Sequence, residues 1–207
     1  MKLYNVCLAF KAERTYIQGP DLFSEMCCHL NEKKLEKINF SIHRVIKNNE
    51  GKLYITDDFH QFKMLPVSFN ASACVTARDK QYWIAFFFSE DIPVKPLRKS
   101  YDENTLTRLC HIDKETIRLE EKSPFLFVET IVSMYKKLLQ TLYPNRGKWL
   151  FTKLVLTSYI IESPEVIFIT LSQNFNFKLI KANIFVDHRF VGELYFSLMP
   201  ENKNDLP

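Results

Sequence analysis

The feature that most limits the fold of this chain is a short motif that occurs twice. Residues 19–25 (GPDLFSE) parallel residues 123–129 (SPFLFVE), with Pro, Leu, Phe and Glu matching at an offset of 104. Further matches, Ala73 with Ala182 and Phe88-Ser89 with Phe196-Ser197, have offsets of 109 and 108. Common residues also match by chance. A near-constant offset in a chain of 207 residues nevertheless predicts one unit of about 100 residues that occurs twice.

Turn signals and hydrophobic patterns predict the same elements in each unit. The stretch from Ile92 to Pro96 contains two prolines and opens a polar region, so we expect units at residues 1–93 and 94–207. Each unit should contain a strand, a helix (21–30 and 125–143) and then antiparallel strands, which is an α+β class. Strands are expected over residues 3–10, 38–46, 52–56, 66–77 and 81–89, then 116–120, 149–159, 166–174, 177–187 and 190–199.

Composition excludes several classes of protein. Hydrophobic residues make up 46% of the chain, enough for a sizeable core, and the four glycines form neither GxGxxG nor GxxxxGK[ST]. The net charge of +4 comes from interspersed signs, so we expect no nucleic-acid partner. The five cysteines form no CxxC and the histidines have no metal spacing, so we expect reduced thiols in the cytoplasm and neither metal nor cofactor. No apolar run reaches 18 residues, so no membrane span is expected.

Glu129 is the most informative candidate for chemistry. The stretch 125–135 is apolar on almost every side, and the neighbours of Glu129 at three and four positions are Phe125, Leu126, Val132 and Ser133. We expect the helix to be deeply buried and Glu129 to be mostly buried. Burial of a carboxylate favours its protonated form, which suits a general acid or base. The alternative is a structural role, with Glu129 capping backbone amides or pairing with an arginine.

Two further groups of residues could bind or react. Glu25 is the repeat partner of Glu129, and its spacing from His29 places both on one helix face, as a dyad or as a solvated helix surface. Arg14, Tyr16 and Gln18 alternate before the first helix. Alternation predicts one strand face, which could bind phosphate or carboxylate or could simply be exposed.

The motif residues resemble the hotdog superfamily. Residues 124–129 (PFLFVE) are similar to the turn that opens the central helix in fatty-acid dehydratases, and residues 180–196 are similar to the last hairpin of that fold. A-factor-biosynthesis-type hotdog proteins have a similar Pro-x-Leu-x-x-Glu helix. The resemblance implies a double hotdog, with two long helices each wrapped by a curved antiparallel β-sheet. Two features depart from the dehydratase pattern: residues 118–124, just before the helix, contain no His, and Ser133 stands where a Gln is usual.

The resemblance implies a protein that acts on acyl thioesters of coenzyme A or acyl carrier protein. The reaction would be dehydration or hydration, thioester hydrolysis or acyl transfer, with Glu129, Glu25 and Ser133 as catalytic candidates. Ser123, Phe125, Arg14 and Tyr16 would then contact the substrate. The alternative is a non-catalytic acyl-binding or assembly protein with a degenerate site. Either function is compatible with a homodimer.

Overall fold

The computed structural model of the protein describes residues 1–32, 34–66, 68–90, 97–160, 164 and 166–199. The chain divides into two compact units. The first contains residues 1–102 and the last part of strand β10 (Lys148–Ile160), and the second contains the rest of the chain from residue 103. The boundary that we predicted between residues 93 and 94 lies outside the described residues.

The first unit is an antiparallel sheet with two helices. Its strands lie in the order β1-β4-β6-β5-β3, with antiparallel neighbours throughout, and β10 follows β3. A separate parallel pair joins β2 to β7. The elements are β1 (Lys2–Cys7), β2 (Phe10–Lys11), α1 (Gly19–Leu30), β3 (Lys34–Ile42), β4 (Glu50–Thr56), α2 (Phe59–Lys63), β5 (Ala71–Ala77), β6 (Lys80–Phe88) and β7 (Arg98–Lys99).

The second unit has the same kind of architecture. Its strands lie in the order β10-β13-β12-β11-β9-β8, and the pairs from β13 to β8 are antiparallel. Its elements besides β10 are α3 (Asn104–Thr107), β8 (Cys110–Asp113), β9 (Thr116–Leu119), α4 (Phe127–Leu142), β11 (Ile167–Phe175), β12 (Leu179–Val186) and β13 (Arg189–Met199).

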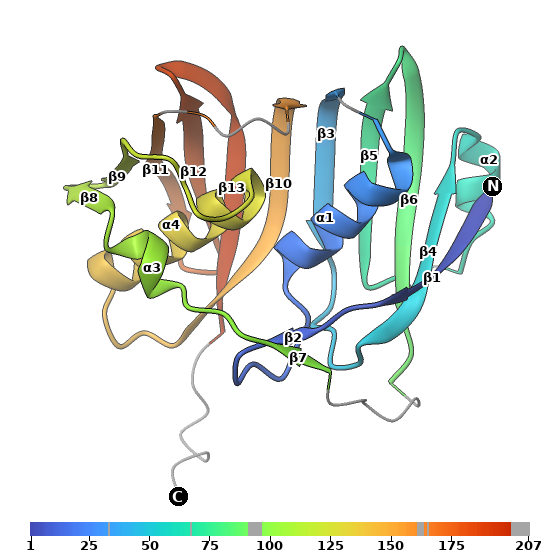
Figure 1. The fold of residues 1–207 in the computed structure, drawn as a ribbon, viewed down its shortest axis with the longest axis horizontal. Helices are drawn as coiled ribbons and strands as arrows, with labels where there is room; N and C mark the ends of the chain where they lie inside the picture. The colour runs from blue at the N-terminus through green and yellow to red at the C-terminus, as the bar shows by residue number, and fades with distance from the viewer. Residues whose placement is uncertain (33, 67, 91–96, 161–163, 165, 200–207) are drawn as a thin grey trace, which may run out of the picture. The chain divides into compact units, whose positions relative to one another are not determined.

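Helix α1 packs its apolar side on the first unit's sheet (Figure 1). Pro20 lies in the first turn, and Asn31 ends the helix in a left-handed conformation with its N–H bonded to Cys27 O. Leu22, Phe23 and Met26 are fully buried. The Phe23 ring meets Phe40 of β3 and Tyr159 of β10 edge-on, at centroid distances of 5.7 and 5.2 Å.

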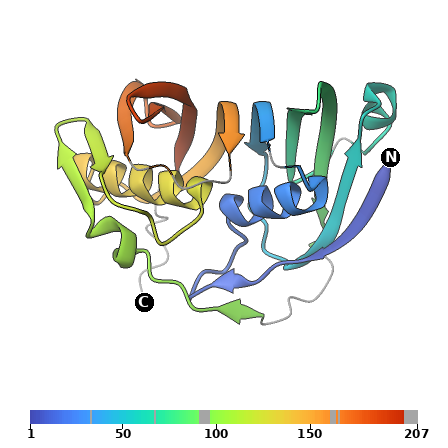
Figure 2. The ribbon, with the colours of Figure 1, turned by 45° about the horizontal axis from the view of Figure 1, so that its top comes forward.

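Half of the residues of helix α4 are buried, and the helix lies against the second unit's sheet (Figure 2). Its Tyr135 ring meets Phe196 of β13 edge-on, at a centroid distance of 5.2 Å. Buried residues come from several sides of the helix, as the apolar sequence predicted. They are Val128, Thr130, Ile131, Ser133, Met134, Tyr135, Leu138 and Leu139.

Two local predictions were wrong. Residues 12–18 form turns and bends, so Arg14, Tyr16 and Gln18 do not share a strand face. The reason is a reversal at Ala12, which has a φ of 48°, followed by a bond from Arg14 N–H to Lys11 O. The second helix begins at Phe127, not Phe125, because Ser123 closes a turn before it. Among the described residues, no helix is long and apolar enough to cross a membrane.

Candidate functional site

Glu129 lies in the first turn of α4 and is partly exposed. The residue is neither fully buried nor open to solvent. Because the helix begins two residues later than expected, Glu129 lies closer to its N-terminal end. A carboxylate in the first turn interacts favourably with the helix dipole.

Ser133 follows Glu129 by four residues and lies on the same side of α4. Only 2% of Ser133 is exposed. The two candidates thus form a short polar stripe that runs from the partly exposed end of the helix into the core of the unit.

Ser123 and Phe125 form the turn that leads into α4. The Phe125 N–H donates to Ser123 Oγ at 3.0 Å, and Ser123 Oγ lies 2.5 Å from Thr130 Oγ1. Thr130 Oγ1 is also 3.0 Å from the carbonyl oxygen of Leu126 and 3.2 Å from that of Phe125. The Ser123 hydroxyl therefore has a structural task, and the Phe125 side chain is partly exposed.

Glu25 and His29 lie on one face of α1, as their spacing predicted. Glu25 Oε1 is 3.0 Å from His29 Nε2, and the two side chains are 27% and 25% exposed. Tyr4 of β1 packs on the imidazole, with ring centroids 4.2 Å apart. This pair belongs to the first unit and Glu129 to the second.

Arg14 belongs to a cluster that the sequence gave no reason to expect. Its guanidinium carbon lies 5.0 Å from the Tyr101 ring centroid, and Lys11 Nζ lies 4.8 Å from the same centroid. Lys11 is 2% exposed and pairs with Asp21 at 3.1 Å, and Lys99 pairs with the same oxygen at 2.9 Å. Tyr16 is partly exposed in the bend that follows.

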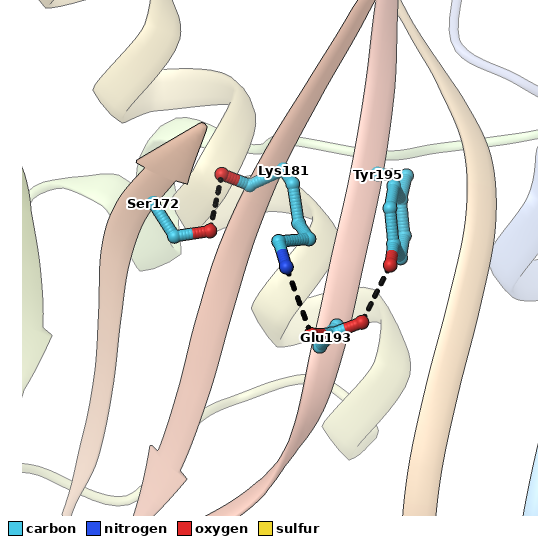
Figure 3. Close-up of polar contacts among 4 residues, drawn as sticks. All are labelled: Ser172, Lys181, Glu193 and Tyr195. Atoms are coloured by element: carbon cyan, nitrogen blue, oxygen red, sulfur yellow. Dashed lines mark hydrogen bonds and ion pairs between the residues drawn. The ribbon is translucent and has the colours of Figure 1, made fainter. Parts of the chain in front are cut away.

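A second unpredicted polar group lies on the second unit's sheet (Figure 3). Tyr195 donates to Glu193 Oε2 at 2.5 Å, and Lys181 Nζ donates to Glu193 Oε1 at 3.0 Å. These bonds hold the pKa of Glu193 below its usual value. Burial and the Glu193 carboxylate raise the pKa of Tyr195 to about 12. The sequence pattern that could have predicted the contact between Glu193 and Tyr195 is the alternation along β13, which places residues 193 and 195 on the same face of the strand.

The adjacent Cys110 and His111 do not form a reactive pair. Burial raises the pKa of the Cys110 thiol to about 11, so it is protonated at neutral pH. Its Sγ donates to Leu106 O at 3.5 Å. Neighbouring residues on strand β8 also point to opposite faces of the sheet.

No protein-family model and no curated protein matches this sequence. Among solved structures, a “putative thioesterase II” from Thermobifida fusca YX superposes with a TM-score of 0.55 at 10% identity. The alignment covers 95% of this chain and 92% of that one. The chain has a hotdog fold. The dehydratase domain of PpsC from Mycobacterium tuberculosis, solved with C12:1-CoA, aligns at 8% identity over 95% and 93% of the two chains, with a TM-score of 0.48.

The hotdog fold places the polar groups on two different layers. Glu25 and Glu129 lie on helices, Glu25 near the middle of α1 and Glu129 in the first turn of α4. Glu193 and Tyr195 lie on the opposite face of the second unit's sheet from α4, because the alternate residues Leu194 and Phe196 are buried beneath the helix. The helix layer is thus the part of this hotdog fold that combines carboxylates with an apolar surrounding.

Proposed function

We propose that this chain is a double hotdog protein, with units at residues 1–93 and 94–207, that processes acyl thioesters of coenzyme A or acyl carrier protein. The reaction would be dehydration or hydration, thioester hydrolysis or acyl transfer. The observation that carries the proposal is the polar stripe of Glu129 and Ser133 at the N-terminal end of a hotdog helix whose first half is otherwise mostly apolar. The thioesterase name of the Thermobifida fusca structure supports it.

The proposed chemistry uses the beginning of α4. Leu126 supplies no side-chain bond to the first amides of the helix, and N–H groups at such an end can polarise a thioester carbonyl. Glu129 would transfer the proton, and Ser133 would hold the polar end of the substrate.

Phe125 and Ser123 would contact the acyl group beside the helix, whereas Arg14 and Tyr16 would contact an anionic part of the carrier. Glu25 with His29 would be a second catalytic pair.

The five cysteines are free thiols, which supports the cytoplasm as the compartment. A homodimer is part of the proposal and is measurable by light scattering. In such a dimer, helix α4 of the second unit would have to stay accessible to the substrate, because the proposed site lies at its N-terminal end.

The test is turnover of a panel of acyl thioesters by wild type and by Glu129→Gln. Loss of a general acid or base lowers the rate by about 10²- to 10⁴-fold, so we expect a loss of at least about 100-fold. Glu120→Gln removes a half-exposed carboxylate next to Arg118 and is the matched control. Full activity of Glu129→Gln would exclude the proposed role. Unfolding of this near-isosteric variant would favour a structural one.

A second function, acyl binding without catalysis, is favoured by one observation. The Ser123 hydroxyl is engaged in the turn before α4, and residues 118–124, just before the helix, contain no His. A protein of this kind would retain acyl thioesters unchanged. Mass spectrometry of the bound ligand after incubation separates the two functions, because an enzyme releases product and a binding protein returns the intact thioester.

A further inference from the structure

One end of the second unit's sheet exposes three large apolar side chains. Phe175 ends β11 and Leu179 begins β12, and these two residues are paired across the strands with 52% and 36% of their surfaces exposed. Met199, the last residue of β13, is 44% exposed. A bond from Leu198 N–H to Phe177 O joins the end of β13 to the turn between β11 and β12. The three side chains therefore belong to one place, which we call the β11–β12 end of the sheet.

The three side chains also lie on one face of the sheet. Leu179 lies two positions before Lys181 on β12 and shares its face, and Phe175 is the direct partner of Leu179. Met199 lies six positions after Glu193 on β13 and shares the face of that residue. Lys181 and Glu193 are bonded to each other on the side of the sheet away from α4. Single exposed apolar residues are ordinary, whereas a group on one face marks a place of contact.

Cations gather at the β11–β12 end. Arg146 and Lys148 lie in the segment 143–149, which leads from α4 into β10, and both are exposed. Lys178 is exposed in the turn between β11 and β12. Neither the segment 143–149 nor the segment 172–181 contains Asp or Glu. The apolar side chains therefore have a positively charged surrounding, which is complementary to an anionic surface.

Three aromatic rings lie next to the exposed side chains. The Phe177 centroid is 5.0 Å from that of Tyr143 and 6.3 Å from that of Trp149. The Arg146 guanidinium carbon lies 5.0 Å from the Phe177 centroid. Tyr, Trp and Arg each combine an apolar body with a polar end, and such side chains suit the boundary between water and the hydrocarbon of a bilayer. The composition of this end is thus that of a segment at a lipid surface.

The other hairpin of the same sheet provides a comparison within the unit. The turn between β12 and β13 has φ values of 48° and 64°, close to the 50° and 62° of the turn between β11 and β12. It also exposes an aromatic and a cation, Phe190 at 48% and Arg189. Asp187, however, lies in this turn. Because the acid offsets the charge of Arg189, this hairpin lacks the positive surrounding of the β11–β12 end.

We propose that the β11–β12 end binds the surface of an anionic phospholipid bilayer. Phe175, Leu179 and Met199 would enter the boundary between the headgroups and the acyl chains. Lys178 and Arg146 would meet the lipid phosphates. This contact goes beyond the proposed chemistry, whose site lies at the opposite end of α4, and does not depend on it.

The test is sedimentation of the full chain with vesicles of phosphatidylcholine that contain or lack phosphatidylserine. We expect binding to the anionic vesicles and at least about tenfold weaker binding to the neutral ones, because each cation near an anionic surface contributes about fivefold. Lys178→Glu should weaken binding to anionic vesicles at least about tenfold, since it reverses one charge. Phe175→Ser should weaken it at least about fivefold, because the serine side chain has no ring to bury.

Matched controls come from the other hairpin. Arg189→Glu reverses a charge and Phe190→Ser removes a ring of similar exposure there, and both variants should bind anionic vesicles as the wild type does. No binding of the wild type to anionic vesicles, or equal losses from the changes at the two hairpins, overturns the proposal.

A nucleic acid is the other anionic partner that the cations could meet. If an oligonucleotide binds the wild type as tightly as the anionic vesicles do, and Phe175→Ser weakens neither, the end is a general polyanion surface and the bilayer proposal is overturned. Loss of vesicle binding in both Lys178→Glu and Phe175→Ser upholds the proposal, whether or not any acyl thioester is turned over.

Discussion

Glu193 shows how much a single partly buried carboxylate can depend on its neighbours. It receives hydrogen bonds from Tyr195 on its own strand and from Lys181 on the next. Both bonds are stronger to the charged carboxylate than to the neutral acid, and together they lower the pKa of Glu193. The stabilisation is present above the ordinary pKa of glutamate and is lost as the pH falls through the lowered value in the folded state.

Glu193→Gln should therefore destabilise the protein by about 1 kcal/mol at pH 7 and by much less at pH 3. Urea denaturation at the two pH values measures the difference. Glu120→Gln, with a half-exposed carboxylate, should change stability by less than about 0.5 kcal/mol at either pH. An equal loss for Glu193→Gln at both pH values would show that its charge does not matter. The network should also weaken between pH 10 and 12, because the pKa of Tyr195 is raised in the folded state.

Residue contacts could be predicted where the geometry of one element fixes them. The contact between Glu25 and His29 follows from helical periodicity alone. The alternation of Arg14, Tyr16 and Gln18 failed because Ala12 reverses the chain. The contacts of Lys11 and Arg14 with Tyr101 join residues about 90 positions apart, and no local pattern carries such information. The roles of Glu129, Ser133, Ser123 and Phe125 stay predictions.

At the scale of elements, the start of α4 depends on one buried side-chain bond. Thr130 is fully buried, and its hydroxyl meets Ser123 Oγ and two carbonyl groups of the preceding turn. These contacts tie the turn before α4 to the first turn of the helix through two carbonyl groups and the Ser123 hydroxyl.

Thr130→Val keeps the shape of the side chain but leaves the Ser123 hydroxyl with fewer partners. We expect a loss of about 1–3 kcal/mol in the free energy of unfolding, measured by urea denaturation. Thr141→Val removes a comparable bond, from Thr141 Oγ1 to Lys137 O, on the exposed side of the same helix. It should cost less than about 0.5 kcal/mol. Equal losses in the two variants would contradict the role of Thr130 in fixing the turn before α4.

Most long elements could be predicted because their patterns are strong. Both main helices were predicted to within two residues at each end, and strands such as β6 and β13 to within one. The strand predicted from residue 66 begins at Ala71, and helix α2 was missed before it. A signal for α2 existed, since Asp58 accepts from the N–H groups of His60 and Gln61 as an N-cap. The five-residue helix is too short for a periodic pattern.

The whole protein should be stabilised by its ligand if the acyl-thioester proposal is right. Long-chain acyl-coenzyme A at 100 times its Kd adds about 2.7 kcal/mol to stability, which scanning calorimetry reads as a higher Tm. Free coenzyme A at the same concentration should have a much smaller effect, because each buried methylene of the acyl chain adds about 0.8 kcal/mol. Acetyl-coenzyme A is the control for chain length and should lie between them. Equal shifts from all three, or none, would exclude an acyl site.

Strand β10 serves both units, and this has a consequence for synthesis on the ribosome. Its last residues complete the first unit, where Tyr159 packs on Phe23 and β10 lies beside β3. They leave the ribosome only after α4 has been made, although every other strand of that unit is finished by residue 99. At about 5–20 residues per second, the edge of β3 stays uncovered for roughly 3–12 s. An uncovered edge invites pairing with another nascent chain, so a gene cut after residue 102 should yield an aggregation-prone product.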